Sequence, residues 1–182
     1  LTITATGGPA QATLSETVSL TWTVWNQGTV AASAGWYDYV YVSNDTALNA
    51  GDVRLDARWR LGTLGADQTY TVTVDVRMPD TGTGDRYLLF ITDGSRRQGE
   101  TDETNNLASR AVRLVAPDLT IAVNSAPGAA ISGETVGVRW TVTNVGNTPA
   151  PADWSDRIYL SANTTLDGSD TWIASYNAAA HT

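Results

Sequence analysis

Residues Glu16–Asp52 read ETVSLTWTVWNQGTVAASAGWYDYVYVSNDTALNAGD, and a second copy of this stretch, ETVGVRWTVTNVGNTPAPADWSDRIYLSANTTLDGSD, begins 118 residues further along and runs from Glu134 to Asp170. Neither copy needs a gap. Residues that are identical at equivalent positions of the two copies include Glu16, Thr17, Val18, Trp22, Thr23, Val24, Asn26, Gly28, Trp36, Asp38, Tyr41, Ser43, Thr46, Leu48 and Asp52. Self-similarity at a fixed long period is the signature of a repeat protein. We therefore predict two repeats, residues 1–116 and 117–182.

Charge and composition exclude several classes of partner. The 182 residues carry 19 acidic and 11 basic side chains, a net charge of −8, and no cysteine. Binding to nucleic acid or to an anionic membrane surface requires a basic patch, so neither is expected. No apolar run approaches the roughly 20 residues that span a bilayer, so no membrane insertion is expected. An acidic surface does suit divalent cations.

Alternating side chains predict strands in both copies. Within Thr17–Trp25, Val18, Leu20, Trp22 and Val24 share one face, which the second copy keeps as Val136, Val138, Trp140 and Val142. Within the next strand, Trp36, Asp38, Val40 and Val42 share the inward face, with Trp154, Asp156, Ile158 and Leu160 as their counterparts. Period-two alternation indicates a half-buried strand. An aspartate therefore recurs on the face that we expect to be buried.

The remaining strands complete an all-β fold. The same reasoning predicts three further strands, each with one inward face, and a last strand at Leu107–Val115. The predicted inward residues are Val53, Leu55, Ala57, Trp59 and Leu61 in the first of the three, Tyr70, Val72, Val74 and Val76 in the second, and Tyr87, Leu89, Ile91 and Asp93 in the third. About seven short strands without helical periodicity predict tandem immunoglobulin-like antiparallel β-sandwiches.

The second repeat is truncated relative to the first. Residue Thr182 corresponds to Leu64, before the last three strands of the first repeat. We expect neighbouring repeats of the same polypeptide, or another chain, to complete the second sandwich. The linker Ala116–Asp118 is short and contains Pro117, which predicts a rod of repeats with little freedom between them.

Four motifs resemble the CARDB family, the cell-adhesion-related domain found in bacteria. They are PDLTI at Pro117–Ile121, W-T-V-x-N-x-G at Trp22–Gly28 and Trp140–Gly146, W-x-D-x-[VI]-Y-[VL]-S at Trp36–Ser43 and Trp154–Ser161, and E-x-N-N at Glu103–Asn106. The resemblance covers nearly the whole chain. It implies an extracellular bacterial protein that works in adhesion or in spacing other domains, and it implies no catalytic residue.

The main candidate metal site combines two inward carboxylates with an acidic loop. Strands carrying Asp38 and Asp93 neighbour each other in an immunoglobulin-like topology, which brings both near the loop that ends the repeat. Its candidate ligands are Asp38, Asp93, Glu100, Glu103 and Asn105. An all-oxygen set of this size suits Ca²⁺. The alternative is that Asp38 and Asp93 only accept hydrogen bonds from loop amides or from Arg96 or Arg97.

A weaker candidate lies in the polar loop of each copy. Asp45, Asn49 and Asp52 recur as Asn163, Asp167 and Asp170. Such a loop can surround a hard cation, but the same residues form Asx turns that satisfy backbone groups. We favour the turn.

The tryptophans and the single histidine complete the search for sites. Trp22, Trp36 and Trp59 fall in the inward phase with Trp140 and Trp154, so we assign them to the core. Trp25 and Trp172 fall in the outward phase, so a ligand-binding role stays open for both. His181 is the only histidine, which leaves no evident general base and predicts that the protein is not an enzyme.

The sequence thus predicts a non-catalytic structural or adhesive repeat module, stiffened by calcium, of a secreted or cell-surface bacterial protein. The alternative is an accessory module that presents a secreted enzyme to a polysaccharide or a protein.

Overall fold

The chain divides into two units, Leu1–Ala116 and Pro117–Thr182. This division is seen in a computed structural model that describes residues 1–33, 35–150 and 154–177. All regular elements among those residues are β-strands, as the alternation predicts. No helix in the described part of the chain is long and apolar enough to cross a membrane.

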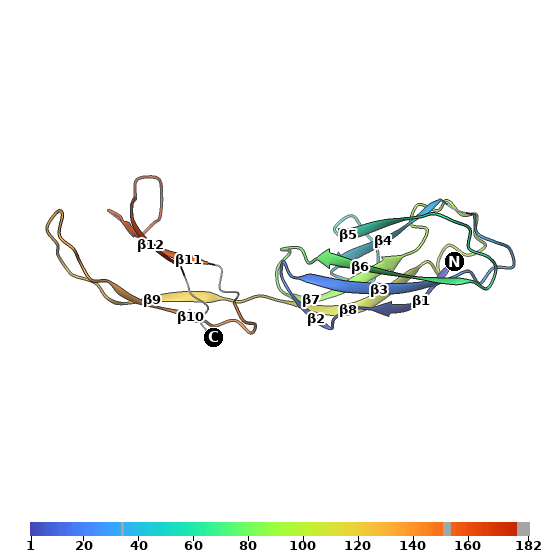
Figure 1. Cartoon of the computed structure of the whole chain (residues 1–182), viewed down its shortest axis with the longest axis horizontal. Helices are drawn as coiled ribbons and strands as arrows, with labels where there is room; N and C mark the ends of the chain where they lie inside the picture. The colour runs from blue at the N-terminus through green and yellow to red at the C-terminus, as the bar shows by residue number, and fades with distance from the viewer. Residues whose placement is uncertain (34, 151–153, 178–182) are drawn as a thin grey trace. The chain divides into compact units, whose positions relative to one another are not determined.

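Eight strands form two facing sheets in the first unit (Figure 1). They are β1 (Thr2–Gly7), β2 (Gln11–Thr13), β3 (Thr17–Trp25), β4 (Trp36–Ser43), β5 (Val53–Arg60), β6 (Thr69–Arg77), β7 (Gly84–Ile91) and β8 (Leu107–Val115). One sheet has the order β1-β3-β6 and the other the order β2-β8-β7-β4-β5. All pairs are antiparallel except β2 with β8. The predicted immunoglobulin-like sandwich is confirmed, and the short β2 is the strand that the sequence pattern did not indicate.

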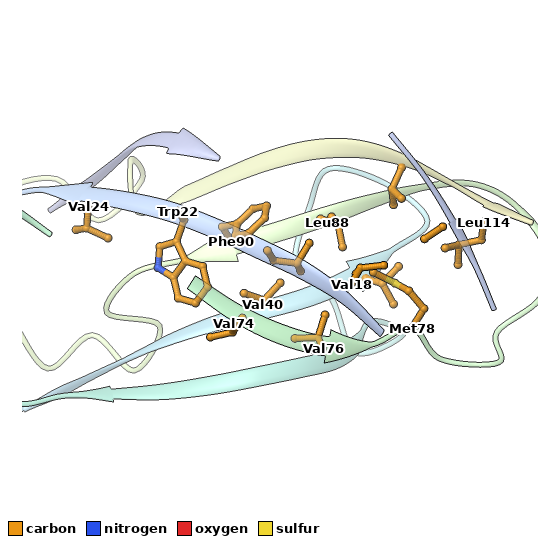
Figure 2. Packing of buried hydrophobic residues seen from close by; sticks show 14 of the residues in the cluster. Val18, Trp22, Val24, Val40, Val74, Val76, Met78, Leu88, Phe90 and Leu114 are labelled. Atoms are coloured by element: carbon orange, nitrogen blue, oxygen red, sulfur yellow. The ribbon is translucent and has the colours of Figure 1, made fainter. Parts of the chain in front are cut away.

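The core lies between the two sheets, and the predicted phases of β3 and β4 are confirmed. Trp22 is 1% exposed and its ring centroid lies 5.9 Å from that of Phe90 on the opposite sheet (Figure 2). The other inward residues of the two strands are buried as well: Val18, Leu20, Val24, Trp36, Asp38, Val40 and Val42. Alternation succeeds in β3 because Thr and Ser residues mark its opposite face, and in β4 because tyrosines occupy the opposite face from Val40 and Val42.

The predicted phase of β5 is confirmed for Leu55 and is wrong for the residues after it. Trp59 is 39% exposed, Val53 37% and Leu61 78%. The strand lies at the edge of its sheet, and its pairing with β4 is irregular between Val40 and Tyr41, where Val40 pairs with Asp56 but Tyr41 with Arg54. The extra residue, Leu55, packs against the core. A one-residue bulge moves every later side chain to the other face, so Trp59 lies outside the core.

The predicted phase of β7 is also wrong. Leu88 and Phe90, rather than Leu89 and Ile91, belong to the core cluster. Leu88 and Phe90 lie on the core face of the sheet because they pair with Val42 and Val40 of β4. Leu89 and Ile91 are buried on the opposite face. A strand with apolar residues on both faces has no alternation from which a phase can be read.

The second unit contains two separate two-stranded sheets, β9 (Leu119–Ser125) with β10 (Arg139–Asn144) and β11 (Ser155–Leu160) with β12 (Thr171–Asn177). The β11–β12 register reproduces that of β4–β5, including the irregularity, now between Ile158 and Tyr159. The positions equivalent to Thr17–Leu20, which pair only with β6 in the first unit, are not strand here. We infer that residues 135–138 form a strand only when they pair with an equivalent of β6.

Candidate metal site

The loop from Asp93 to Asn106 joins β7 to β8, and Asp93 shapes its first turn. This side chain is 1% exposed. Its two carboxylate oxygens accept hydrogen bonds from the backbone N–H groups of Arg97 at 2.9 Å and Gln98 at 2.7 Å. Its backbone has a φ of 44°, a left-handed conformation that aspartate tolerates better than most residues. Asp93 thus accepts hydrogen bonds from loop amides, one of the two roles that the sequence left open.

Three carboxylates of this loop come together. Asp93, Glu100 and Glu103 each offer an oxygen, and these oxygens lie within 4.8 Å of one another, the one such group in the described part of the chain. Calcium binds oxygen at about 2.3–2.6 Å, so two ligands of one ion lie up to about 5 Å apart. The group is compact enough to share a single ion.

Several buried oxygens near this group have no hydrogen-bond donor. Among the described residues, Glu103 Oε2, Asn105 Oδ1 and Asn106 Oδ1 lack a partner. Asn106 is 6% exposed, and its Nδ2 donates to Glu100 Oε2 at 2.6 Å, which places its amide beside the carboxylates. Buried polar atoms are nearly always paired. An unpaired oxygen within the group of carboxylates and two unpaired amide oxygens of the same loop indicate a missing cation or donor.

One positive group reaches the cluster. The α-amino group of Leu1 contacts the Glu100 carboxylate. Burial lowers the pKa of this amino group, and the charges of Glu103, Asp93 and Asp102 oppose that effect.

A cavity of ≈ 510 Å³ adjoins the cluster. Glu100, Asp102 and Asn105 line one side, and the loop after β3, residues 26–32, lines the other. Asn26 holds that loop in place, because its Nδ2 donates to the carbonyls of Val30, Leu64 and Gly65 at 2.9–3.1 Å. The cavity gives a small ion a path to Glu100.

Asp38 has a different environment from the other predicted ligands. It is 1% exposed, and it is not a member of the group of three carboxylates. Its Oδ2 accepts hydrogen bonds from Tyr70 Oη at 2.6 Å and Trp22 Nε1 at 3.2 Å, and its Oδ1 accepts one from Thr92 Oγ1 at 2.9 Å. Core side chains, rather than loop amides or arginines, are the donors.

Burial raises the pKa of Asp38, although the hydrogen bonds from Tyr70, Trp22, Thr92 and Trp36 oppose the rise. The pKa of Tyr70 is also raised, first by burial and then by the charge of Asp38. The second unit repeats the central contact, since Trp140 Nε1 donates to Asp156 Oδ2 at 2.8 Å. Asp38 is thus a polar member of the core of the first unit, and the partly buried Asp156 keeps its contact with tryptophan.

The weaker candidate loops form Asx turns. Asp45 Oδ1 accepts the N–H of Ala47 at 2.8 Å, Asn49 Oδ1 that of Gly51 at 2.8 Å, and Asp52 Oδ2 that of Asn49 at 2.7 Å. The second copy repeats all three bonds with the oxygens of Asn163, Asp167 and Asp170. A hydrogen bond from the Ser169 hydroxyl, followed by one from its backbone, lowers the pKa of Asp167. Backbone groups already use these oxygens.

Sequence reasoning missed the three donors to Asp38. The available signal was joint repetition: Trp22 and Asp38 recur together as Trp140 and Asp156 at the same separation. Tyr70 and Thr92 lie beyond the duplicated stretch and gave no such signal.

The outward tryptophans differ in exposure. Trp172 is 59% exposed, as predicted, whereas Trp25 is only partly exposed. The sole histidine, His181, lies outside the described residues.

Comparison with known proteins gives a family match. Residues 1–110 match the model of the CARDB family, and no curated protein matches the chain. A structure of the CARDB domain of the PF1109 protein from Pyrococcus furiosus, in complex with di-metal ions, is similar at 20% identity, over 60% of this chain and 84% of that one, with a TM-score of 0.47. A solution structure of the same domain matches at 18% identity over 60% and 89% of the two chains, again with a TM-score of 0.47.

Glycosidases are also similar over part of their length. A β-glucosidase from Listeria innocua, in complex with isofagomine, matches at 13% identity and a TM-score of 0.40. The match covers 60% of this chain but 15% of the enzyme.

Proposed function

Because its residues 1–110 match the family model, the chain belongs to the CARDB family, and we propose that it is a non-catalytic adhesive or spacer module whose Asp93–Asn106 loop is stiffened by calcium. CARDB is a cell-adhesion-related bacterial domain, and the family is one of non-enzymatic modules. For this chain we propose a secreted or cell-surface location. Its proposed partners are neighbouring repeats and a surface protein or polysaccharide.

One observation supports a bound cation: a compact group of carboxylates lies in a loop that also holds buried oxygens without donors. Asp93, Glu100 and Glu103 supply the charge. The Asn106 amide contacts Glu100, Asn105 lines the same cavity as Glu100, and the amide oxygens of both asparagines have no partner in the described structure. Crowded carboxylates in a half-buried place must protonate or bind a cation. Oxygen ligands favour calcium or magnesium over zinc or iron. A flexible loop with several carboxylates favours calcium, because magnesium demands near-ideal octahedral geometry.

The ligands come from both ends of the loop, which is why binding would stiffen it. Asp93 lies two residues after the end of β7, whereas Glu103, Asn105 and Asn106 lie within the four residues before β8. An ion that binds all of them ties the two ends together. Asp38 and the Asx-turn loops are not among the proposed ligands, because none of their carboxylates belongs to the group of three.

Calorimetric titration tests the site. The protein is acetylated at its amino terminus, so that the Leu1 ammonium does not compete, and is treated with EDTA before calcium is added. We expect wild type to bind calcium and Glu103→Gln to bind it at least about tenfold more weakly, since affinity follows the number of charged ligands.

The matched control is Asp102→Asn, which removes the same charge from the adjacent residue. Asp102 lies outside the group of three, and its Oδ1 accepts hydrogen bonds from the N–H and hydroxyl of Thr104 at 2.9 and 2.6 Å. It should bind nearly as wild type does. Absence of heat in wild type, or equal weakening in both variants, would contradict a specific site.

A further inference from the structure

An aromatic surface covers the outer face of the five-stranded sheet in the first unit. Tyr37 pairs in register with Trp59, Tyr39 with Ile91, and Tyr41 with Leu89. Paired residues share a face of the sheet, and this face is opposite to the core residues Trp36, Asp38, Val40 and Val42. We call Tyr37, Tyr39, Tyr41 and Trp59 the aromatic strip.

The rings of the strip contact one another. The centroids of Tyr37 and Trp59 lie 4.7 Å apart, those of Tyr37 and Tyr39 lie 5.7 Å apart with nearly parallel planes, and those of Tyr39 and Tyr41 lie 6.1 Å apart. Tyr37 is 36% exposed and Trp59 39%. The strip therefore offers large ring surfaces to solvent.

The acidic loop holds the strip rigid from one side. The N–H of Gly94 donates to the carbonyl of Tyr37 at 3.1 Å, and the hydroxyls of Tyr39 and Ser95 lie 3.1 Å apart. A Cβ on Gly94 would lie 2.3 Å from Tyr39 Cδ2, so Gly94 packs directly on that ring. Pre-ordered rings lose little conformational entropy when a ligand binds.

Two arginines add positive charge to this face of an acidic protein. The guanidinium of Arg54 lies 5.7 Å from the centroid of Tyr39, and that of Arg97 lies 5.3 Å from that of Trp59. Both residues are exposed. In the described structure neither forms an ion pair with a carboxylate. Their charge is available to an anionic ligand.

The fold does not require this strip. At the equivalent positions of the second copy, Tyr37, Tyr39 and Trp59 become Ser155, Arg157 and Asn177, although the pairing register is the same. The buried Trp22 and Asp38, in contrast, keep their identities as Trp140 and Asp156. Three of the four strip residues are therefore particular to the first unit, while Tyr41 is kept as Tyr159.

We propose that the aromatic strip, with Arg54 and Arg97, binds a carboxylated polysaccharide. The apolar face of a sugar ring stacks on an exposed aromatic ring, and a uronate carboxylate accepts paired hydrogen bonds from a guanidinium. The adjacent exposed rings of Tyr37 and Trp59, on neighbouring strands, suit a polymer of repeating flat units better than an acidic peptide, which offers charge without stacking surfaces. The proposal deepens the adhesive role and rests on it, but it uses a surface other than the cation loop.

The test is binding of the full chain to polygalacturonate in EDTA, compared with the fully methyl-esterified polymer, polyglutamate and dextran. Chelation removes the cation loop from the experiment, so failure here and failure of the calcium site are distinguishable. We expect polygalacturonate to bind. The methyl ester should bind at least about tenfold more weakly, because it loses the charge-assisted contact with the guanidinium groups.

Two variants locate the site. Trp59→Ala and Arg97→Gln should each weaken binding about tenfold. Trp25→Ala, on the outer face of the other sheet, and Arg113→Gln, whose guanidinium lies 3.3 Å from Asp85, should leave it unchanged. Arg97→Gln alters no buried side chain, so it is informative even if Trp59→Ala unfolds.

Several results would overturn the proposal: no binding to polygalacturonate, binding that both Trp59→Ala and Arg97→Gln retain, or equal binding to polyglutamate. Self-association of wild type that Trp59→Ala abolishes would overturn it too, because the strip would then face a second copy of the chain.

Discussion

Asp38 joins three strands through its carboxylate. Its donors are Trp22 on β3, Tyr70 on β6 and Thr92 just after β7, and β3 and β6 belong to the sheet opposite its own. A buried network that is fully satisfied fixes a unique arrangement of the elements it connects. We infer that Asp38 sets how the two sheets of the first unit face each other.

Asp38→Ala should lower the free energy of unfolding by about 3 kcal/mol, because it leaves the buried indole N–H and the two hydroxyls without their acceptor. Urea unfolding measures this loss. Asp45→Ala, on an exposed turn, is the control and should cost about 1 kcal/mol or less. A loss for Asp38→Ala no larger than that of the control would contradict the network.

The stability difference between wild type and Asp38→Asn should depend on pH. Burial raises the folded-state pKa of Asp38, so the folded state holds the proton more tightly than the unfolded state does. Wild type should therefore lose stability relative to Asp38→Asn as pH rises from the ordinary aspartate pKa through the raised one, and the difference should be constant above it. Urea unfolding of both proteins between acidic and neutral pH measures this. A difference that grows in favour of wild type as pH rises would be the wrong sign.

At the scale of elements, the sequence predicted strands better than it predicted which face each strand buries. β3 alternates apolar residues with Thr and Ser, and β4 alternates its buried residues with tyrosines, so their buried faces were readable. β5 and β7 were not, because Leu55 forms a bulge and because β7 is apolar on both faces. The loop residues of the cluster, Glu100 and Glu103, were identified from their charge. Asp38 was grouped with these loop residues because the alternation showed that it is buried but did not show which side chains of the opposite sheet donate hydrogen bonds to it.

Gly94 connects the acidic loop to the outer face of the sheet. Gly94→Ala should cost about 1–3 kcal/mol, because the new methyl group overlaps the Tyr39 ring and overpacking strains the neighbouring structure. Gly99→Ala, in the same loop, is the control, since no atom lies within 4 Å of its added Cβ. Thermal unfolding compares them. Equal effects would show that the Tyr39 contact is unimportant.

At the scale of the whole molecule, the two units differ in how well their apolar faces are covered. In the first unit the sheets bury one another, whereas in the second Ile121 is 65% exposed, Val123 67% and Leu160 66%. Trp36 Nε1 donates to Tyr70 Oη at 3.2 Å, but the equivalent Trp154 Nε1 has no partner among the described residues. Few buried apolar contacts give low local stability.

Limited chymotryptic digestion of the full chain should therefore cut the second unit first, and mass spectrometry should find a persisting fragment that contains residues 1–116. The aromatic residues of β11 and β12, Tyr159 and Tyr176, are the expected early sites. Loss of both units at the same rate would show that they are equally stable.

Calcium-dependent hydrogen exchange of the Asp93–Asn106 loop tests the central claim most directly, because stiffening is itself the quantity measured. On the acetylated protein, calcium should slow exchange of the amides between residues 94 and 106 by about tenfold or more, which corresponds to about 1.4 kcal/mol of added local stability. The Asx-turn loop at residues 45–52 should exchange at the same rate with and without calcium. Unchanged exchange in the acidic loop, or equal slowing in both loops, would contradict a calcium-stiffened module.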